Sequence, residues 1–104
     1  MERTDDGGYR FRTELWMHDG DAGWHFVTVP ADVSDDIEAR TSDQRRGFGS
    51  VRVRFVVGAT TWSTSVFPDS KQRAFVLPVK QEVRRLEELA VGDDVDVVLR
   101  LVDA

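Results

Sequence analysis

Two cationic side chains four residues apart, Lys80 and Arg84, are the residues whose type and spacing most clearly suggest chemistry. We expect a helix over residues 79–89, in which positions four apart lie side by side, so that the two cations repel each other. This helix would carry its cations in the first half and Glu87 and Glu88 in the last half, the reverse of what the helix dipole favours. A segment that opposes two local preferences indicates a function, and two cations near a helix start suit an anion.

The candidate anion site therefore comprises Lys80 and Arg84, and we expect Arg52 or Arg54 to approach them. A functional pair of cations should lack close carboxylate partners and should share an accessible concave surface. The structural alternative is that acidic residues of a first helix or of the last strand neutralise both cations, which is the commoner role of charged surface residues. The sequence leaves both interpretations open.

Charge is segregated along the chain, which has 104 residues and a net charge of −5. Residues 1–44 carry 4 basic and 11 acidic side chains, residues 45–85 carry 9 and 2, and residues 86–104 carry 1 and 6. The overall acidity weighs against nonspecific binding to nucleic acid, whose affinity comes from phosphate contacts. We therefore expect no tight DNA binding at physiological salt, in spite of the basic central segment.

No catalytic residue, metal ligand or cofactor site is predicted. The absence of cysteine excludes disulfides, thiolate catalysis and zinc–cysteine sites, and it fits a cytosolic protein. The spacing of His18, Asp19 and Asp21 matches no calcium or zinc pattern, so a polar turn is the better interpretation. His25 has no serine in a Gly-x-Ser-x-Gly elbow to activate, and no Gly-rich phosphate loop is present.

Three tryptophans, Trp16, Trp24 and Trp62, are a large aromatic content for a chain of this length. Trp24 and Phe26 would share one face of a strand. Packing in the core is the default expectation, because aromatic side chains dominate small cores. A pocket or a partner surface is the alternative.

Period-two alternation predicts strands over residues 9–17, 24–29, 50–57, 59–67, 73–77 and 95–102, with helices over 31–40 and 79–89. This order, β-β-α-β-β-β-α-β, predicts a mainly β protein: a closed or nearly closed six-stranded barrel with two short helices, since closure removes exposed strand edges. An open antiparallel sheet with both helices on one face is the alternative. Residues 1–8 are expected to be a disordered lead-in and residues 9–104 a single domain.

Several segments resemble the DUF1905 family in their order and spacing over residues 9–102. They are Gly23–Pro30 (GWHFVTVP), the VRVR run at 51–54 with Gly58, Ser63–Ser65 and Pro68, the VLPVK run at 76–80 with VRR at 83–85, and VGDDVDV at 91–97. The resemblance implies a small six-stranded barrel of the double-split or cradle-loop type. The family has no established activity, so the resemblance implies no catalytic residue.

We expect a non-enzymatic binding module for a small anionic ligand or an acidic protein partner, without membrane or nucleic-acid partners. The alternatives are a nucleic-acid-binding regulator, by analogy with swapped-hairpin barrels, and an enzyme whose site is not recognisable in the sequence.

Overall fold

The computed structural model describes residues 2–18, 23–42 and 49–102. Seven strands and two helices follow one another as β1 (Glu2–Arg3), β2 (Tyr9–Met17), β3 (His25–Thr28), α1 (Ala31–Thr41), β4 (Val51–Val57), β5 (Thr60–Asp69), β6 (Ala74–Pro78), α2 (Gln81–Leu86) and β7 (Asp94–Leu101). Asp19 and Asp21 of the predicted polar turn lie outside the described residues.

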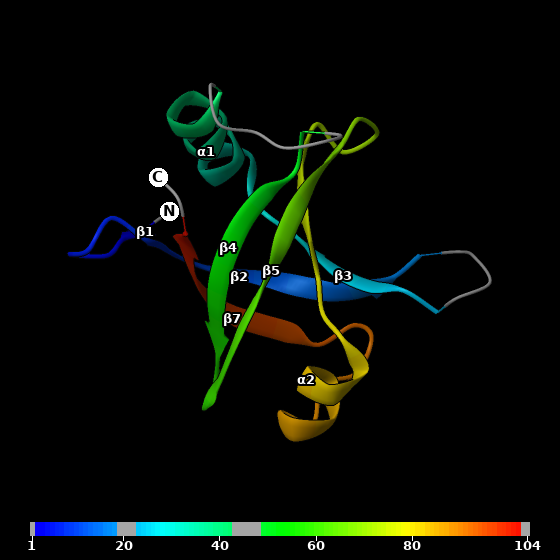
Figure 1. Ribbon diagram of the computed structural model, residues 1–104. Coiled ribbons are helices and arrows are strands. Elements are labelled where there is room, and N and C mark those ends of the chain that lie inside the picture. Colours follow the sequence, from blue (N-terminus) through cyan, green and yellow to red (C-terminus); the bar gives the residue numbers. More distant parts are fainter. Residues whose placement is uncertain (1, 19–22, 43–48, 103–104) are drawn as a thin grey trace.

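Six strands close into an antiparallel barrel, as predicted. The strand order is β1-β2-β3-β6-β5-β4-β7, and β7 pairs back with β2, for example Phe11 with Val97. Closure leaves β1 as the extra strand. The helices lie toward opposite ends of the barrel, α1 after β3 and α2 between β6 and β7 (Figure 1). The alternative of an open sheet with both helices on one face is wrong.

The segment before β2 differs from the expected disordered lead-in over residues 1–8. Glu2 pairs with Arg10 and Arg3 pairs with Tyr9, so that β1 extends the edge of β2. The Arg3 guanidinium also lies 3.3 Å from a carboxylate oxygen of Asp36 on α1. These backbone and ionic contacts hold a polar segment that has no apolar side chain of its own to bury.

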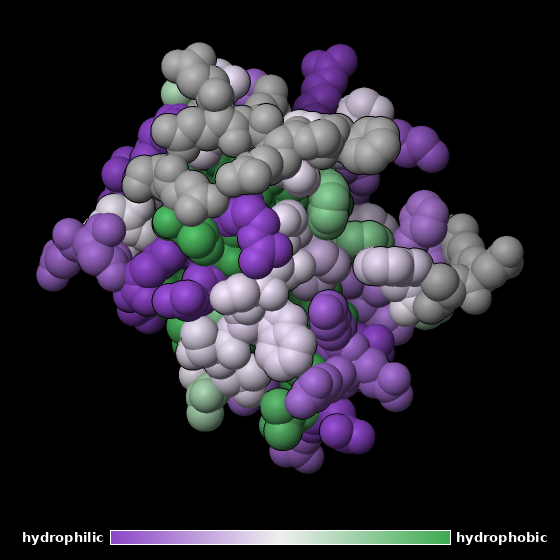
Figure 2. All heavy atoms as spheres, viewed as in Figure 1, coloured by the Kyte–Doolittle hydropathy of each residue, from purple (hydrophilic) through white to green (hydrophobic). Residues whose placement is uncertain are grey.

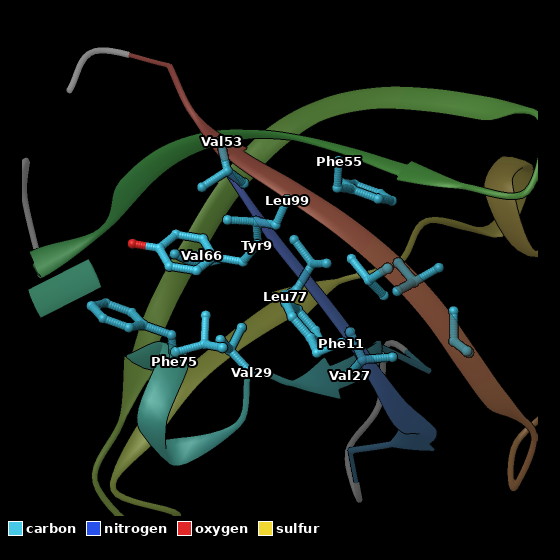
Figure 3. Close-up of a cluster of buried hydrophobic side chains, with 14 of the residues drawn as sticks. Tyr9, Phe11, Val27, Val29, Val53, Phe55, Val66, Phe75, Leu77 and Leu99 are labelled. Carbon is cyan, nitrogen blue, oxygen red and sulfur yellow. The ribbon is translucent and has the colours of Figure 1, made fainter. Parts of the chain in front are cut away.

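The core fills the barrel with the inward side chains of β2, β4, β6 and β7 (Figure 3). The apolar members of the alternating and helical patterns predict nine buried residues: Phe11, Leu15, Val53, Phe55, Val83, Leu86, Val95, Val97 and Leu99. All of them except Leu86 are buried. The alternation of the strands therefore specifies the register correctly, because a slip of one residue would have exposed every one of the strand residues.

Leu86 is the exception, with 58% of its surface exposed. The predicted helix over 79–89 is shorter in the structure and ends at Leu86, since Glu88 adopts a left-handed φ of 53°. The chain turns there, and Leu89 rather than Leu86 packs against the core. Val83 is therefore the last residue of α2 whose apolar side chain is buried.

The pair Gly92–Asp93 predicts a sharp structural turn before the last strand, and this turn lies between α2 and β7. Gly92 takes a φ of 96°, which a residue with a Cβ rarely adopts. The carboxylate of Asp93 accepts a hydrogen bond of 2.8 Å from the backbone N–H of Ala90. The backbone of the same turn is tied to Leu15 on β2 by bonds in both directions.

α1 is joined to the barrel by two polar contacts. The Ser34 hydroxyl donates to the Val29 carbonyl and accepts from the Phe75 N–H, each at 3.0 Å. The fully buried Tyr9 donates its hydroxyl hydrogen to the carboxylate of Asp36, and the Arg40 guanidinium donates to the Tyr9 oxygen at 2.7 Å. Burial, with the bond to Asp36, raises the pKa of Tyr9 above its ordinary value of 10.0.

Tyr9 is the only tyrosine, so its titration can be followed by absorbance. We expect it to ionise above pH 10.0 in the native protein and near that value in denaturant. A raised folded pKa means that its stabilising contribution is complete below the ordinary pKa and is lost as the pH rises toward the folded one. Tyr9→Phe should cost about 1–2 kcal/mol at neutral pH. The deficit relative to the wild type should shrink above about pH 10 in chemical unfolding; a constant deficit would contradict the assignment.

Candidate functional site: a cationic pocket where two strands part

A pocket of about 390 Å³ opens where β5 separates from β6. The two strands pair only from Phe67 to Asp69, and before that point β5 runs away from β6 while α2 lies below them (Figure 1). The lining comes from the start of β3, from β5, from the end of β6 and from α2. We call this the cationic pocket, and its residues are Gly23, Trp24, His25, Thr64, Phe67, Pro78, Val79, Lys80, Gln81 and Arg84.

Arg84 is held in place by two hydrogen bonds. Its Nε–H donates to the Val79 carbonyl at 3.1 Å, and its Nη1 lies 3.3 Å from Nε2 of His25. A guanidinium has five N–H donors and no acceptor. Three of these donors therefore remain available, in a fork whose orientation is already fixed.

His25 takes the tautomer that this contact requires. Its Nδ1 lies 2.6 Å from the carbonyl of Gly23, which can only accept, so Nδ1 carries the hydrogen. Nε2 then has a free lone pair that accepts from Arg84, whose N–H groups can only donate. In this arrangement the imidazole of His25 positions the guanidinium of Arg84.

Lys80 lies over an aromatic ring. Its Nζ is 5.6 Å from the centroid of the Trp62 ring, on β5, a geometry in which the ring quadrupole attracts the ammonium group. The side chain of Lys80 is exposed, so all three of its N–H donors can reach solvent or a ligand.

Neither cation of the pocket has a carboxylate partner within residues 2–18, 23–42 and 49–102. The ion pairs found there join Arg3 and Arg40 to Asp36 and link Arg10, Arg12 and Arg100 to other carboxylates. Five arginines are thus paired with carboxylates, whereas Lys80 and Arg84 share one cavity without such a partner. The hydroxyl of Thr64 adds a further hydrogen-bonding group to the same cavity.

The reasoning from the helix dipole that first pointed to these cations is wrong. α2 has only six residues, with Glu82 in its first turn and Arg84 in its last turn, which is the arrangement that the dipole favours. Lys80 precedes the helix as its N-cap. The support for the site is instead the shared concave surface and the missing carboxylate partners.

Arg52 and Arg54 lie elsewhere. On β4 they stand opposite Ser65 and Ser63 of β5, on the outer face of the sheet. Thr64, which lines the cationic pocket, stands opposite the buried Val53 and therefore belongs to the inner face. The sheet separates the two arginines from the pocket, and neither of them lines it.

Sequence reasoning missed His25, Thr64 and Phe67 as pocket residues. They come from strands far apart in the chain, and no spacing in the sequence links them to Lys80. The alternation of β3 offered one indication, since Val27 and Val29 face inward and so place His25 on that same side. This alternation did not indicate that β5 and β6 would separate next to His25.

In the described part of the chain, no three histidine, aspartate or glutamate side chains gather to hold a metal ion. Neither α1 nor α2 has the length and apolar composition of a membrane-crossing helix. The fold and the site thus define a small closed antiparallel barrel with a cationic pocket in its wall.

The chain belongs to the DUF1905 family, a domain of unknown function, whose model matches residues 11–99. This match confirms the resemblance noted in the sequence. No curated protein matches the chain. Because the family is defined without an activity, what the pocket binds has to be argued from its own residues.

The contacts of Arg84 predict how its replacement affects stability. Arg84→Ala removes two hydrogen bonds and no ion pair, so we expect a loss of about 1–2 kcal/mol in the free energy of unfolding. Lys80→Met, which keeps the apolar stem, should cost less than about 1 kcal/mol through the lost contact with Trp62. Chemical unfolding measures both values. A loss of about 3 kcal/mol or more for Lys80→Met would indicate a buried ion pair and would contradict this description.

Proposed function

We propose that this protein is a non-enzymatic binding module that holds a small anionic ligand in the cationic pocket. The observation that carries the proposal is that Lys80 and Arg84 share one cavity and have no carboxylate partner among the described residues. A carboxylate or phosphate would supply the missing countercharge. Hydrogen bonds to charged groups contribute about 1.5–3 kcal/mol each, more than neutral ones.

The size of the cavity favours a small ligand over a protein partner. A volume of about 390 Å³ lies within the range of about 300–1,000 Å³ that is typical of small-molecule sites. Arg84 is also preorganised by His25 and Val79, so that little side-chain freedom is lost on binding. The net charge of −5 would repel a polyanion such as DNA at long range, whereas a small anion feels mainly the nearby cations. The absence of cysteine supports a cytoplasmic location.

The experiment compares two variants that lose the same charge. Lys80→Met/Arg84→Gln removes both cations of the pocket, and Arg52→Gln/Arg54→Gln removes two cations from the outer face of β4. Calorimetric titration with phenyl phosphate should show an affinity at least about tenfold weaker for the first variant, since about 1.4 kcal/mol corresponds to tenfold. The second variant should bind like the wild type.

Equal weakening in both variants would show that binding follows net charge and not the pocket, and the proposal would be wrong. Unchanged binding in Lys80→Met/Arg84→Gln would also contradict the proposal. Circular dichroism of both variants controls for loss of the fold.

A further inference from the structure

An aromatic surface adjoins the cationic pocket on the outer side of the barrel wall. Registers place Trp16 opposite Phe26 across β2 and β3, and Phe67 opposite Val76 across β5 and β6. Together with Trp24, which directly precedes β3, these side chains line a hollow of about 420 Å³. We call Trp16, Trp24, Phe26, Phe67 and Val76 the aromatic shelf.

The rings of the shelf are stacked and partly exposed. The Trp24 and Phe26 centroids are 6.1 Å apart with planes inclined by 13°, and Trp16 lies 5.2 Å from Phe26. The indole N–H of Trp16 donates to the hydroxyl of Thr28 at 2.9 Å, which fixes that ring. Trp24 is 55% exposed and Phe67 39% exposed. The default expectation that the tryptophans pack in the core is therefore wrong for Trp24.

The shelf and the cationic pocket form one continuous surface, because Trp24 and Phe67 line both. The two parts differ in chemistry. Arg84 and Lys80 lie on the pocket side, and Asp69 borders the shelf but not the pocket. An anionic group would be drawn to the pocket side and repelled from the Asp69 side, so that a bound molecule would have a defined orientation.

We propose that the ligand of the cationic pocket is an aromatic anion, whose planar ring lies against Trp24 and Phe67 while its phosphate or carboxylate meets Arg84 and Lys80. This proposal rests on the proposed function and adds the class of ligand. Aromatic rings prefer offset or edge-to-face contacts at centroid distances of about 4.5–7 Å, which an exposed indole face beside a cavity allows. A ring that covers Trp24 would also remove exposed apolar surface from water.

Size favours a small molecule over a second copy of the chain as the occupant of this surface. A two-fold symmetric interface brings the same patch of both subunits together. Only side chains near the two-fold axis would meet their own copies, so the size of the site is the better guide to its occupant. The cationic pocket and the hollow of the shelf hold about 390 and 420 Å³, within the range of about 300–1,000 Å³ that is typical of small-molecule sites. A small aromatic anion fits these cavities and supplies the countercharge that Lys80 and Arg84 lack among the described residues.

The experiment uses three phosphate monoesters that share a head group and differ in ring area: methyl, phenyl and 1-naphthyl phosphate. Calorimetric titration of the wild type should give affinities that rise in that order. Trp24→Ala should weaken the binding of 1-naphthyl phosphate by about tenfold, which is the size of effect seen when a side chain that stacks on a nucleic-acid base is replaced by alanine. Methyl phosphate has no ring to stack, so Trp24→Ala should weaken its binding less than that of 1-naphthyl phosphate. Phe67→Ala provides a second variant, and Val91→Ala, an exposed apolar residue outside both surfaces, should leave the whole series unchanged.

Each outcome separates the two proposals. Equal affinities for the three esters, with no effect of Trp24→Ala or Phe67→Ala but a loss in Lys80→Met/Arg84→Gln, would overturn the aromatic preference and leave the anion site. Ring-dependent binding that survives Lys80→Met/Arg84→Gln would overturn the proposed function. Dimerisation in sedimentation experiments that is abolished by Trp24→Ala would identify the shelf as an interface between copies and would overturn this inference.

Discussion

The parting of β5 from β6 is the constraint on which the site depends. β5 pairs with β4 along seven residues but with β6 along only three, from Phe67 to Asp69. The inner face of β5 near Thr64 therefore has no neighbouring strand on that side. α2 lies across the opening and covers part of it, with Val83 buried in the core. What remains uncovered is the cationic pocket, so the cavity is a consequence of how the barrel closes.

One strand supplies both parts of the proposed ligand surface. Successive residues of a strand point to opposite faces. At the start of β3 this alternation turns His25 toward the pocket and Arg84, while Trp24 and Phe26 lie on the outer face. A ligand at the edge of the opening can therefore meet a fixed guanidinium and a stacked ring pair at once. Figure 2 shows hydrophilic side chains around α2 and paler ones over the front strands.

The pocket brings two unpaired cations into one cavity. Elsewhere five described arginines lie within ion-pair distance of carboxylates, such as Arg12 with Asp96 at 2.8 Å, where the ion pair holds the pKa of Asp96 below its usual value. Both members of that pair are exposed, so their contribution to stability is small. Lys80 and Arg84 instead keep their charge without a carboxylate partner among the described residues. This is tolerated because both stay in contact with solvent.

The sequence by itself predicted the barrel, the buried face of the strands and eight core residues, because alternation in β2, β4 and β7 reports directly which face is buried. It also indicated Lys80 and Arg84, although through an unfavourable charge layout on a longer helix, whereas the observed six-residue helix carries its charges as the dipole favours. Only the tertiary structure decided that Arg52 lies on the other face and that His25 and Phe67 join the pocket. The physical reason is that the tertiary fold brings together residues far apart in the chain, such as His25 and Arg84, which are 59 positions apart, and local periodicity carries no information about such contacts.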